Sequence, residues 1–170
     1  MELWDVYDKH GNFTGAVKTS GDIIHEGEYQ LAASAWIINP EGKLLIQKRA
    51  AVKKTNPNTW NITGGMVRSG EDSRHGCIRE VREEIGIKLD IKKIELLYRA
   101  FGKDMIFDDY VIILDFPLSD AVLQADEVSE IKWASIDEIK EHYNNGEFMF
   151  TDITKLDDVG AYIGEHIHKG

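Results

Sequence analysis

The sequence contains a single cysteine, Cys77, among its 170 residues. One thiol cannot form a disulfide within the chain, so a reducing, cytoplasmic location is expected. The chain also lacks an apolar run of the roughly 18 residues that a membrane span needs. Its N-terminus shows no basic segment followed by an apolar one, so no secretory signal is expected.

Basic residues and prolines are also scarce. The chain has 20 Lys and Arg against 30 Asp and Glu, a formal net charge of −10. This charge argues against binding a nucleic-acid polymer by general electrostatic attraction. A small phosphorylated ligand stays open, because a divalent cation can mediate that contact. With three prolines, no repeat and no low-complexity tract, we expect one domain spanning residues 1–170.

Hydrophobic patterning predicts a mixed set of strands and helices. Residues 3–7 and 13–19 flank a turn and predict an N-terminal hairpin extension within residues 1–28, and residues 30–39 and 43–49 predict a longer hairpin. The polar stretch 50–59 predicts an exposed loop. Further strands are expected at 91–100, 109–118 and 129–135, and amphipathic helices at 136–145 and 152–167. This mixture favours a layered α/β arrangement.

A central helix is predicted over residues 73–85, capped by Asp72 or Ser73 and ended by Gly86. At about 100° per residue, its apolar side chains share one arc: Cys77, Ile78, Val81 and Ile85. Three glutamates, Glu80, Glu83 and Glu84, fall on another arc, on average more than about 100° away. Like charges at this spacing repel by about 0.2–0.5 kcal/mol per pair, so we expect water or a cation against them.

The surroundings of this helix form a longer motif. Gly65 is followed six positions later by Glu71, and eight positions beyond that by Arg79 and Glu80. Then come Val81, Glu83, Glu84, Gly86 and Ile87. This resembles the Nudix box, which is a glycine, five residues, Glu, seven residues, Arg-Glu-aliphatic, one residue, Glu-Glu, one residue and Gly-aliphatic. Every specified position is matched without a gap.

The resemblance implies a Nudix-like α/β/α sandwich, with a mixed sheet and the box helix packed on it. It also implies metal-dependent hydrolysis of a phosphoanhydride, with Mg²⁺ or Mn²⁺ as cofactor. The chemistry suits the residues, because Mg²⁺ prefers oxygen ligands and carboxylates three and four apart point the same way from a helix. A bound metal ion offsets their mutual repulsion, bridges phosphate oxygens and lowers the pKa of a bound water.

Roles follow from the resemblance, residue by residue. Glu80 and Glu84 are assigned as the chief metal ligands. Glu83 is assigned as a further ligand or as the base that activates water. Arg79 is expected to orient a carboxylate through a bidentate pair with Glu71. The alternative for Arg79 is an exposed pair with Glu83, one helical turn away, which contributes little.

The glycines and a later loop complete the expected site. Gly65 would let the backbone come close to metal and phosphate, and Gly64 is assigned a carbonyl ligand. Family members often add a carboxylate from a later loop. Glu127 is the first candidate for this ligand, and Asp108 and Asp109 are the second.

Basic and aromatic residues flank the expected cleft. The candidates for phosphate contacts are Arg49, Lys54 and Arg68, with Lys48 and Lys53 beside them. Trp36, Trp60, Phe101 and Tyr110 could stack on a ring of the substrate, although aromatic residues in strands usually belong to the core.

Two other functions remain open at this point. Residues 1–87 also resemble isopentenyl-diphosphate isomerases, which share the Nudix fold and use a cysteine and metal-binding histidines. Here the matching stretch NITGGMV has Gly64 and no cysteine, and Gln30 stands in place of a histidine ligand. The third function is a non-catalytic sensor of a nucleotide-like ligand, which usually has a degenerate box. We therefore expect a hydrolase of a nucleoside diphosphate derivative or a small organic diphosphate, and similar proteins are commonly homodimers.

Overall fold

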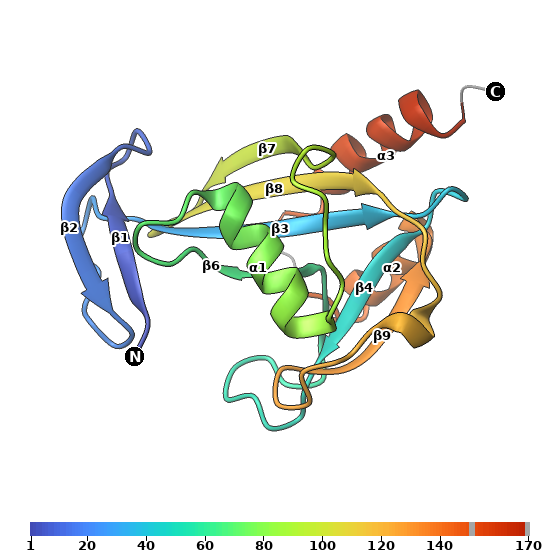
Figure 1. The fold of residues 1–170 in the computed structure, drawn as a ribbon, viewed down its shortest axis with the longest axis horizontal. Helices are drawn as coiled ribbons and strands as arrows, with labels where there is room; N and C mark the ends of the chain where they lie inside the picture. Colours follow the sequence, from blue (N-terminus) through green and yellow to red (C-terminus); the bar gives the residue numbers. More distant parts are fainter. Residues whose placement is uncertain (150–151, 169–170) are drawn as a thin grey trace.

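The computed structural model describes residues 1–149 and 152–168. A mixed sheet lies at its centre, with helix α1 (Ser73–Ile85) on one face (Figure 1). Helices α2 (Ile136–Asn144) and α3 (Lys155–His166) pack against the other face. The predicted α/β/α sandwich with a mixed sheet is therefore confirmed. No helix in the described ranges is both long enough and apolar enough to span a membrane.

Within the described residues, the sheet contains seven strands. They are β3 (Gln30–Ile38), β4 (Leu44–Arg49), β5 (Trp60–Asn61), β6 (Thr63–Met66), β7 (Glu95–Phe101), β8 (Met105–Ile113) and β9 (Val128–Ala134). The main order is β5-β4-β3-β8-β7, with β6 paired to β3 and β9 paired to β4. β3 runs parallel to β8 along its whole length, and the other pairs are antiparallel.

The long hairpin predicted from β3 and β4 pairs only at its tip. Ile38 and Leu44 are the registered partners, and beyond them the two strands diverge. Residues 60–66 fill the opening, since β5 pairs with β4 and β6 pairs with β3. This wedge between the strands brings Thr63 and the two following glycines to the centre of the sheet, beneath α1.

The core has two layers, because side chains along a strand point to alternate faces. On β3, Leu31, Ala33, Ala35 and Ile37 pack towards Cys77, Val81 and Ile85 of α1. Trp36 and Ile38 pack on the other side, against Ile139 of α2 and the buried side chains of α3. Each large apolar side chain buried in this way contributes about 1.5–3 kcal/mol. The predicted apolar face of the box helix is therefore the face that anchors it.

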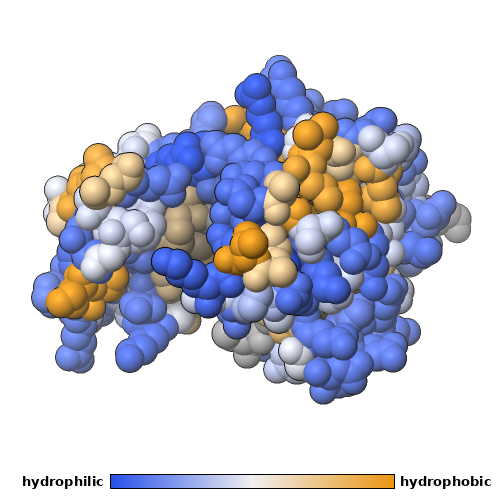
Figure 2. All heavy atoms as spheres, turned by 90° about the horizontal axis from the view of Figure 1, so that it is seen from below, coloured by the Kyte–Doolittle hydropathy of each residue, from blue (hydrophilic) through white to orange (hydrophobic). Residues whose placement is uncertain are grey.

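The N-terminal hairpin forms a separate two-stranded sheet of β1 (Leu3–Tyr7) and β2 (Phe13–Thr19). It contacts the loop before α1, since Ser69 N donates to Leu3 O at 2.7 Å and Asp5 accepts from Ser69 Oγ at 2.5 Å. Figure 2 shows small, separate apolar patches at the end of the molecule where this hairpin lies, and a larger apolar patch towards the opposite end. The exposed apolar side chains of residues 1–28 include Leu3, Phe13, Val17 and Ile23.

The boundaries of β7, β8 and α3 differ from the predicted boundaries. β7 begins at Glu95 rather than at residue 91, because residues 90–93 form a turn in which Asp90 O accepts from Lys93 N at 2.9 Å. β8 begins at Met105 rather than at residue 109, and it ends at Ile113 rather than at residue 118. These bounds match β3, because β8 pairs with β3 from Gln30 to Ile38. α3 begins at Lys155, three residues later than predicted.

Candidate active site

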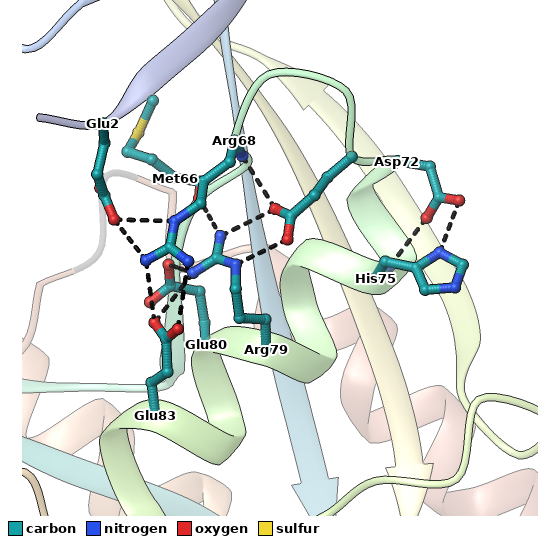
Figure 3. Close-up of polar contacts among 9 residues, drawn as sticks. Glu2, Met66, Arg68, Asp72, His75, Arg79, Glu80 and Glu83 are labelled. Carbon is teal, nitrogen blue, oxygen red and sulfur yellow. Dashed lines mark hydrogen bonds and ion pairs between the residues drawn. The ribbon is translucent and has the colours of Figure 1, made fainter.

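Local sequence sets both ends of the box helix. Asp72 accepts a hydrogen bond from His75 N at 2.9 Å and so caps the start of α1 (Figure 3). At the other end, Gly86 has φ +72°, a left-handed conformation that glycine adopts without strain. Its N–H donates to Arg82 O. Both predicted ends of the helix are confirmed.

Arg79, in the middle of α1, is the centre of a polar network (Figure 3). Its Nε and Nη2 donate to the two oxygens of Glu71 at 2.8 and 3.0 Å, which is the expected bidentate pair. Its Nη2 also donates to Met66 O at 2.9 Å. Its Nη1 donates to Glu80 at 2.5 Å and to Glu83 at 3.1 Å. The pair with Glu71 and the alternative pair with Glu83 therefore coexist, and one guanidinium orients three carboxylates.

Arg68 joins this network from the loop. Its Nε and Nη2 donate to Glu2 at 2.9 and 2.5 Å, and its Nη1 and Nη2 donate to Glu83 at the longer distances of 3.3 and 3.4 Å. Figure 3 shows both arginines among the carboxylates. Glu2, Glu71, Glu80 and Glu83 supply four negative charges against the two positive charges of the arginines. When all are ionised, two negative charges remain, which favours a divalent cation here.

The two glycines of the wedge have different neighbours. A Cβ atom on Gly65 would lie 2.5 Å from the carboxyl carbon of Glu80. A Cβ atom on Gly64 would lie 2.5 Å from Ala33 O and 2.6 Å from Ser34 Cα, both backbone atoms of β3. Gly65 therefore leaves room for the Glu80 carboxylate, whereas Gly64 is required for β6 to pack against β3.

Glu84 corrects the expectation that the three box glutamates share an exposed arc. It is buried, with 8% of its surface exposed, and its Oε2 accepts from Gln47 Nε2 at 2.6 Å. The helical wheel contained a signal for this, because Glu84 lies only about 20° from Cys77 around the axis. Burial raises the pKa of the Glu84 carboxyl to about 7.

Gln47 is a site residue that the sequence analysis missed. It is buried on β4, and its Oε1 accepts from Thr63 Oγ1 at 2.8 Å. A polar residue directly after the apolar run Leu44–Ile46 was the available signal. Gln47 points towards α1, so Lys48 points to the other face of the sheet, where its Nζ lies 5.6 Å from the Trp60 ring. The expectation that Lys48 flanks the cleft is therefore wrong.

The raised pKa of Glu84 predicts a pH dependence of stability in metal-free protein. Between its ordinary pKa of 4.5 and about 7, the folded state binds more protons than the unfolded state. The free energy of unfolding therefore falls as pH rises through this window, by on the order of 2–3 kcal/mol from this group. Glu84→Gln is expected to remove that fall, measured by urea unfolding at pH 5 and pH 8 in EDTA. Equal pH slopes for the variant and the wild type would contradict the assignment.

Glu127, the first candidate for a ligand from a later loop, comes near the C-terminal half of α1. Gln124 N donates to Glu84 O at 2.9 Å, which ties this segment to the helix. The negative charge of Glu127 raises the pKa of Glu84 further, whereas the positive charge of Arg49 lowers it. Lys53 Nζ donates to both Glu127 oxygens, at 2.7 and 2.6 Å. The carboxylate is thus nearby and paired with a lysine of the 50–59 loop.

Asp108 and Asp109 are occupied elsewhere. Asp108 is fully buried and accepts from Arg99 Nε and Nη2 at 2.6 and 2.7 Å. Asp109 accepts from Trp36 Nε1 at 3.1 Å and from Tyr98 Oη at 2.5 Å. Because Trp36 belongs to the core layer on the α2 and α3 side, Asp109 faces away from the box helix. Neither aspartate is placed to complete the carboxylate set.

The remaining substrate-contact candidates are dispersed. Arg49 Nε donates to Thr55 O at 3.2 Å, and Lys54 is exposed in the same loop. Of the aromatic candidates, three are buried in the core: Trp36, Trp60 and Tyr110. Phe101 is exposed, with its ring packed edge-on against Tyr29 at 6.1 Å. The core interpretation of strand aromatics therefore holds for three of the four.

The predicted metal ligands carry suitable chemistry but are not gathered around one point. Within residues 1–149 and 152–168, no three His, Cys, Asp or Glu side chains are arranged to hold a metal ion. Glu80 and Glu83 accept hydrogen bonds from Arg79, whereas Glu84 accepts one from Gln47. The carboxylate donors and the excess negative charge nevertheless fit a hard divalent cation.

Comparison with known proteins identifies the family. The model of the NUDIX domain matches residues 28–151, so the N-terminal hairpin precedes the matched region. An uncharacterised Nudix hydrolase of Listeria monocytogenes is 34% identical, over 88% of this chain and 89% of that protein. Isopentenyl-diphosphate Delta-isomerase 2 of Photorhabdus laumondii is 30% identical, over 88% of this chain and 86% of that protein.

Among solved structures, DR0079 of Deinococcus radiodurans has the same fold. The TM-score is 0.77 at 21% identity, over 94% of this chain and 98% of that one. The intact box, its geometry on α1 and these similarities agree. The chain belongs to the Nudix family and is a Nudix-type hydrolase.

Proposed function

We propose that this hydrolase cleaves a phosphoanhydride bond in a nucleoside diphosphate derivative or a small organic diphosphate, using Mg²⁺ or Mn²⁺ and an activated water. The observation that carries the proposal is the cluster of Glu71, Glu80 and Glu83 around Arg79, next to Gly65. Divalent ions are typical of the Nudix family. The similarity to an isopentenyl-diphosphate isomerase supports a small organic diphosphate among the substrates.

Glu80 and Glu84 would hold the cation as its chief ligands, with the carbonyl groups of Gly64 and Gly65, and Glu83 would be a further ligand or the base. When bound, the cation would neutralise phosphate charge and acidify a water molecule. Arg79 keeps the Glu80 carboxylate beside Gly65, and it keeps Glu71 in place through two hydrogen bonds.

Glu83 is the best-placed base among the box glutamates. Its side chain is 41% exposed, and its hydrogen bonds to the arginines are 3.1–3.4 Å long. It is therefore loosely held and accessible, and it would take the proton of the attacking water. Glu127 is a secondary acid or base candidate, once it separates from Lys53. Arg49, Lys54 and Arg68 would contact the phosphates.

The alternatives receive less support from the residues. The thiol of Cys77 is fully buried on the core side of α1, and burial raises its pKa to about 12. It is therefore unsuited to the proton transfers of an isomerase. A ligand sensor without catalysis would not require the bidentate Arg79–Glu71 pair or the buried Glu84. We extend the proposal to a cytoplasmic location, which the lone cysteine supports, and to a homodimer, which light scattering tests.

The test is release of phosphate or nucleotide from a panel of nucleoside diphosphate derivatives and small organic diphosphates, with Mg²⁺, Mn²⁺ or EDTA. Turnover is expected only with metal, and Glu83→Gln and Glu84→Gln are each expected to reduce kcat by about 100-fold or more. Glu141→Gln, an exposed glutamate on α2, serves as the control and should retain full activity. Ligand-induced thermal stabilisation without turnover on any compound would favour the sensor.

A further inference from the structure

A chain of three buried polar side chains crosses the interior beneath α1. Thr63 of β6, Gln47 of β4 and Glu84 of α1 are 1%, 4% and 8% exposed. Thr63 Oγ1 donates to Gln47 Oε1 at 2.8 Å, and Gln47 Nε2 donates to Glu84 Oε2 at 2.6 Å. These groups meet because β3 and β4 diverge and residues 60–66 fill the opening between them.

The direction of the chain is determined at Glu84, because an ionised carboxylate only accepts hydrogen bonds. A glutamine amide has one accepting end and one donating end, and the two ends can exchange by rotation. The Glu84 carboxylate accepts from the NH₂ end, and the threonine hydroxyl, which can donate or accept, donates to the carbonyl end. The opposite orientation would place the amide oxygen against the carboxylate oxygen, with both buried and neither satisfied.

The side-chain carboxylate of Glu84 has a single hydrogen-bond partner among the described residues, and that partner is Gln47. Gln47 therefore holds Oε2 of Glu84 towards the sheet, while Oε1 makes no hydrogen bond within the described ranges. One anchored oxygen and one available oxygen suit a carboxylate that binds a metal ion through a single oxygen. Groups that orient a metal ligand in this way typically change metal affinity or activity by 10–100-fold when removed.

We propose that Gln47 is a positioning residue for the metal ligand Glu84, and that Thr63 anchors the other end of the Gln47 amide. The inference rests on the proposed metal-dependent function. It adds two residues outside the Nudix box, from β4 and β6, to the apparatus that prepares the box helix for the cation.

The test measures Mn²⁺ affinity directly, from the electron paramagnetic resonance signal of free Mn²⁺, on wild type, Gln47→Met, Thr63→Val and Thr63→Ser. Gln47→Met keeps the size of the side chain and removes the donor, so Mn²⁺ binding is expected to weaken by about 10–100-fold. Thr63→Val removes only the hydroxyl and should weaken binding by a smaller factor, whereas Thr63→Ser should restore it. Gln124→Met, an exposed glutamine, is the matched control.

Kinetics provide a second readout. The Mn²⁺ concentration for half-maximal turnover should rise in Gln47→Met and Thr63→Val, while KM for the diphosphate at saturating Mn²⁺ stays unchanged. If Gln47→Met fails to fold in a thermal scan, the Thr63→Val and Thr63→Ser pair still decides the question. Unchanged or tighter Mn²⁺ binding in Thr63→Val, with an active wild type, would overturn this proposal alone. A wild type that neither binds Mn²⁺ nor hydrolyses any diphosphate would overturn the proposed function together with it.

Discussion

Arg79→Met is expected to reduce turnover by at least about 100-fold and to lower the free energy of unfolding by about 2–3 kcal/mol. Arg79 is 15% exposed and donates to Glu71, Glu80, Glu83 and Met66 O. Removing one partner of a buried ion pair leaves uncompensated charge and costs about 3–5 kcal/mol; partial exposure of the glutamates reduces this. Activity should fall by at least about 100-fold, because Glu71 and Glu80 lose the group that orients them.

The comparison with Arg79→Lys separates charge from geometry. Lysine keeps the positive charge but cannot form the two parallel hydrogen bonds to Glu71. Stability should therefore recover in part, while kcat stays well below the wild-type value. Arg82→Met, at an exposed position on the same helix, should change stability by no more than about 0.5 kcal/mol. Urea unfolding and steady-state kinetics measure both quantities, and full activity in Arg79→Lys would show that charge alone is sufficient.

Gly65→Ala is expected to reduce activity, whereas Gly64→Ala is expected to reduce stability. The new Cβ at Gly65 would meet the end of the Glu80 side chain, which can rotate away. The free energy of unfolding should therefore fall by about 1 kcal/mol or less. Displacement of Glu80 should nevertheless reduce kcat by about 100-fold, as is typical when a catalytic group is misplaced. At Gly64 the Cβ would meet the backbone of Ala33 and Ser34, which cannot move without breaking the β3–β6 pairing.

Gly64→Ala should accordingly lower the free energy of unfolding by about 3 kcal/mol or more, because it overpacks the core and strains the backbone. Gly164→Ala provides the control, because this helical glycine of α3 has open space around it and alanine is the better helix former by about 1 kcal/mol. Thermal unfolding and kcat are measured on all three variants. A stable, inactive Gly64→Ala variant would contradict the assigned packing role.

Most of the box helix could be predicted because its determinants are local. Asp72, Gly86 and the arc of Cys77, Val81 and Ile85 act within a few residues of the backbone they organise. The Arg79–Glu71 pair is also near-local, since the two residues are eight positions apart across one turn and two helical turns. The resemblance to the Nudix box added roles to these positions, which residue spacing alone would not have assigned.

Local sequence was therefore sufficient to predict the box helix, its ends, its anchored face and its carboxylate motif, since short-range hydrogen bonds and helical periodicity decide these. The tertiary structure alone decided that β3 and β4 diverge, that β8 pairs with β3, and that Gln47 meets Glu84. These contacts join residues far apart in the chain, and their energy appears only when backbone pairing and burial bring the strands together. Periodicity assigns a residue to a face, but long-range packing decides which partner it finds there.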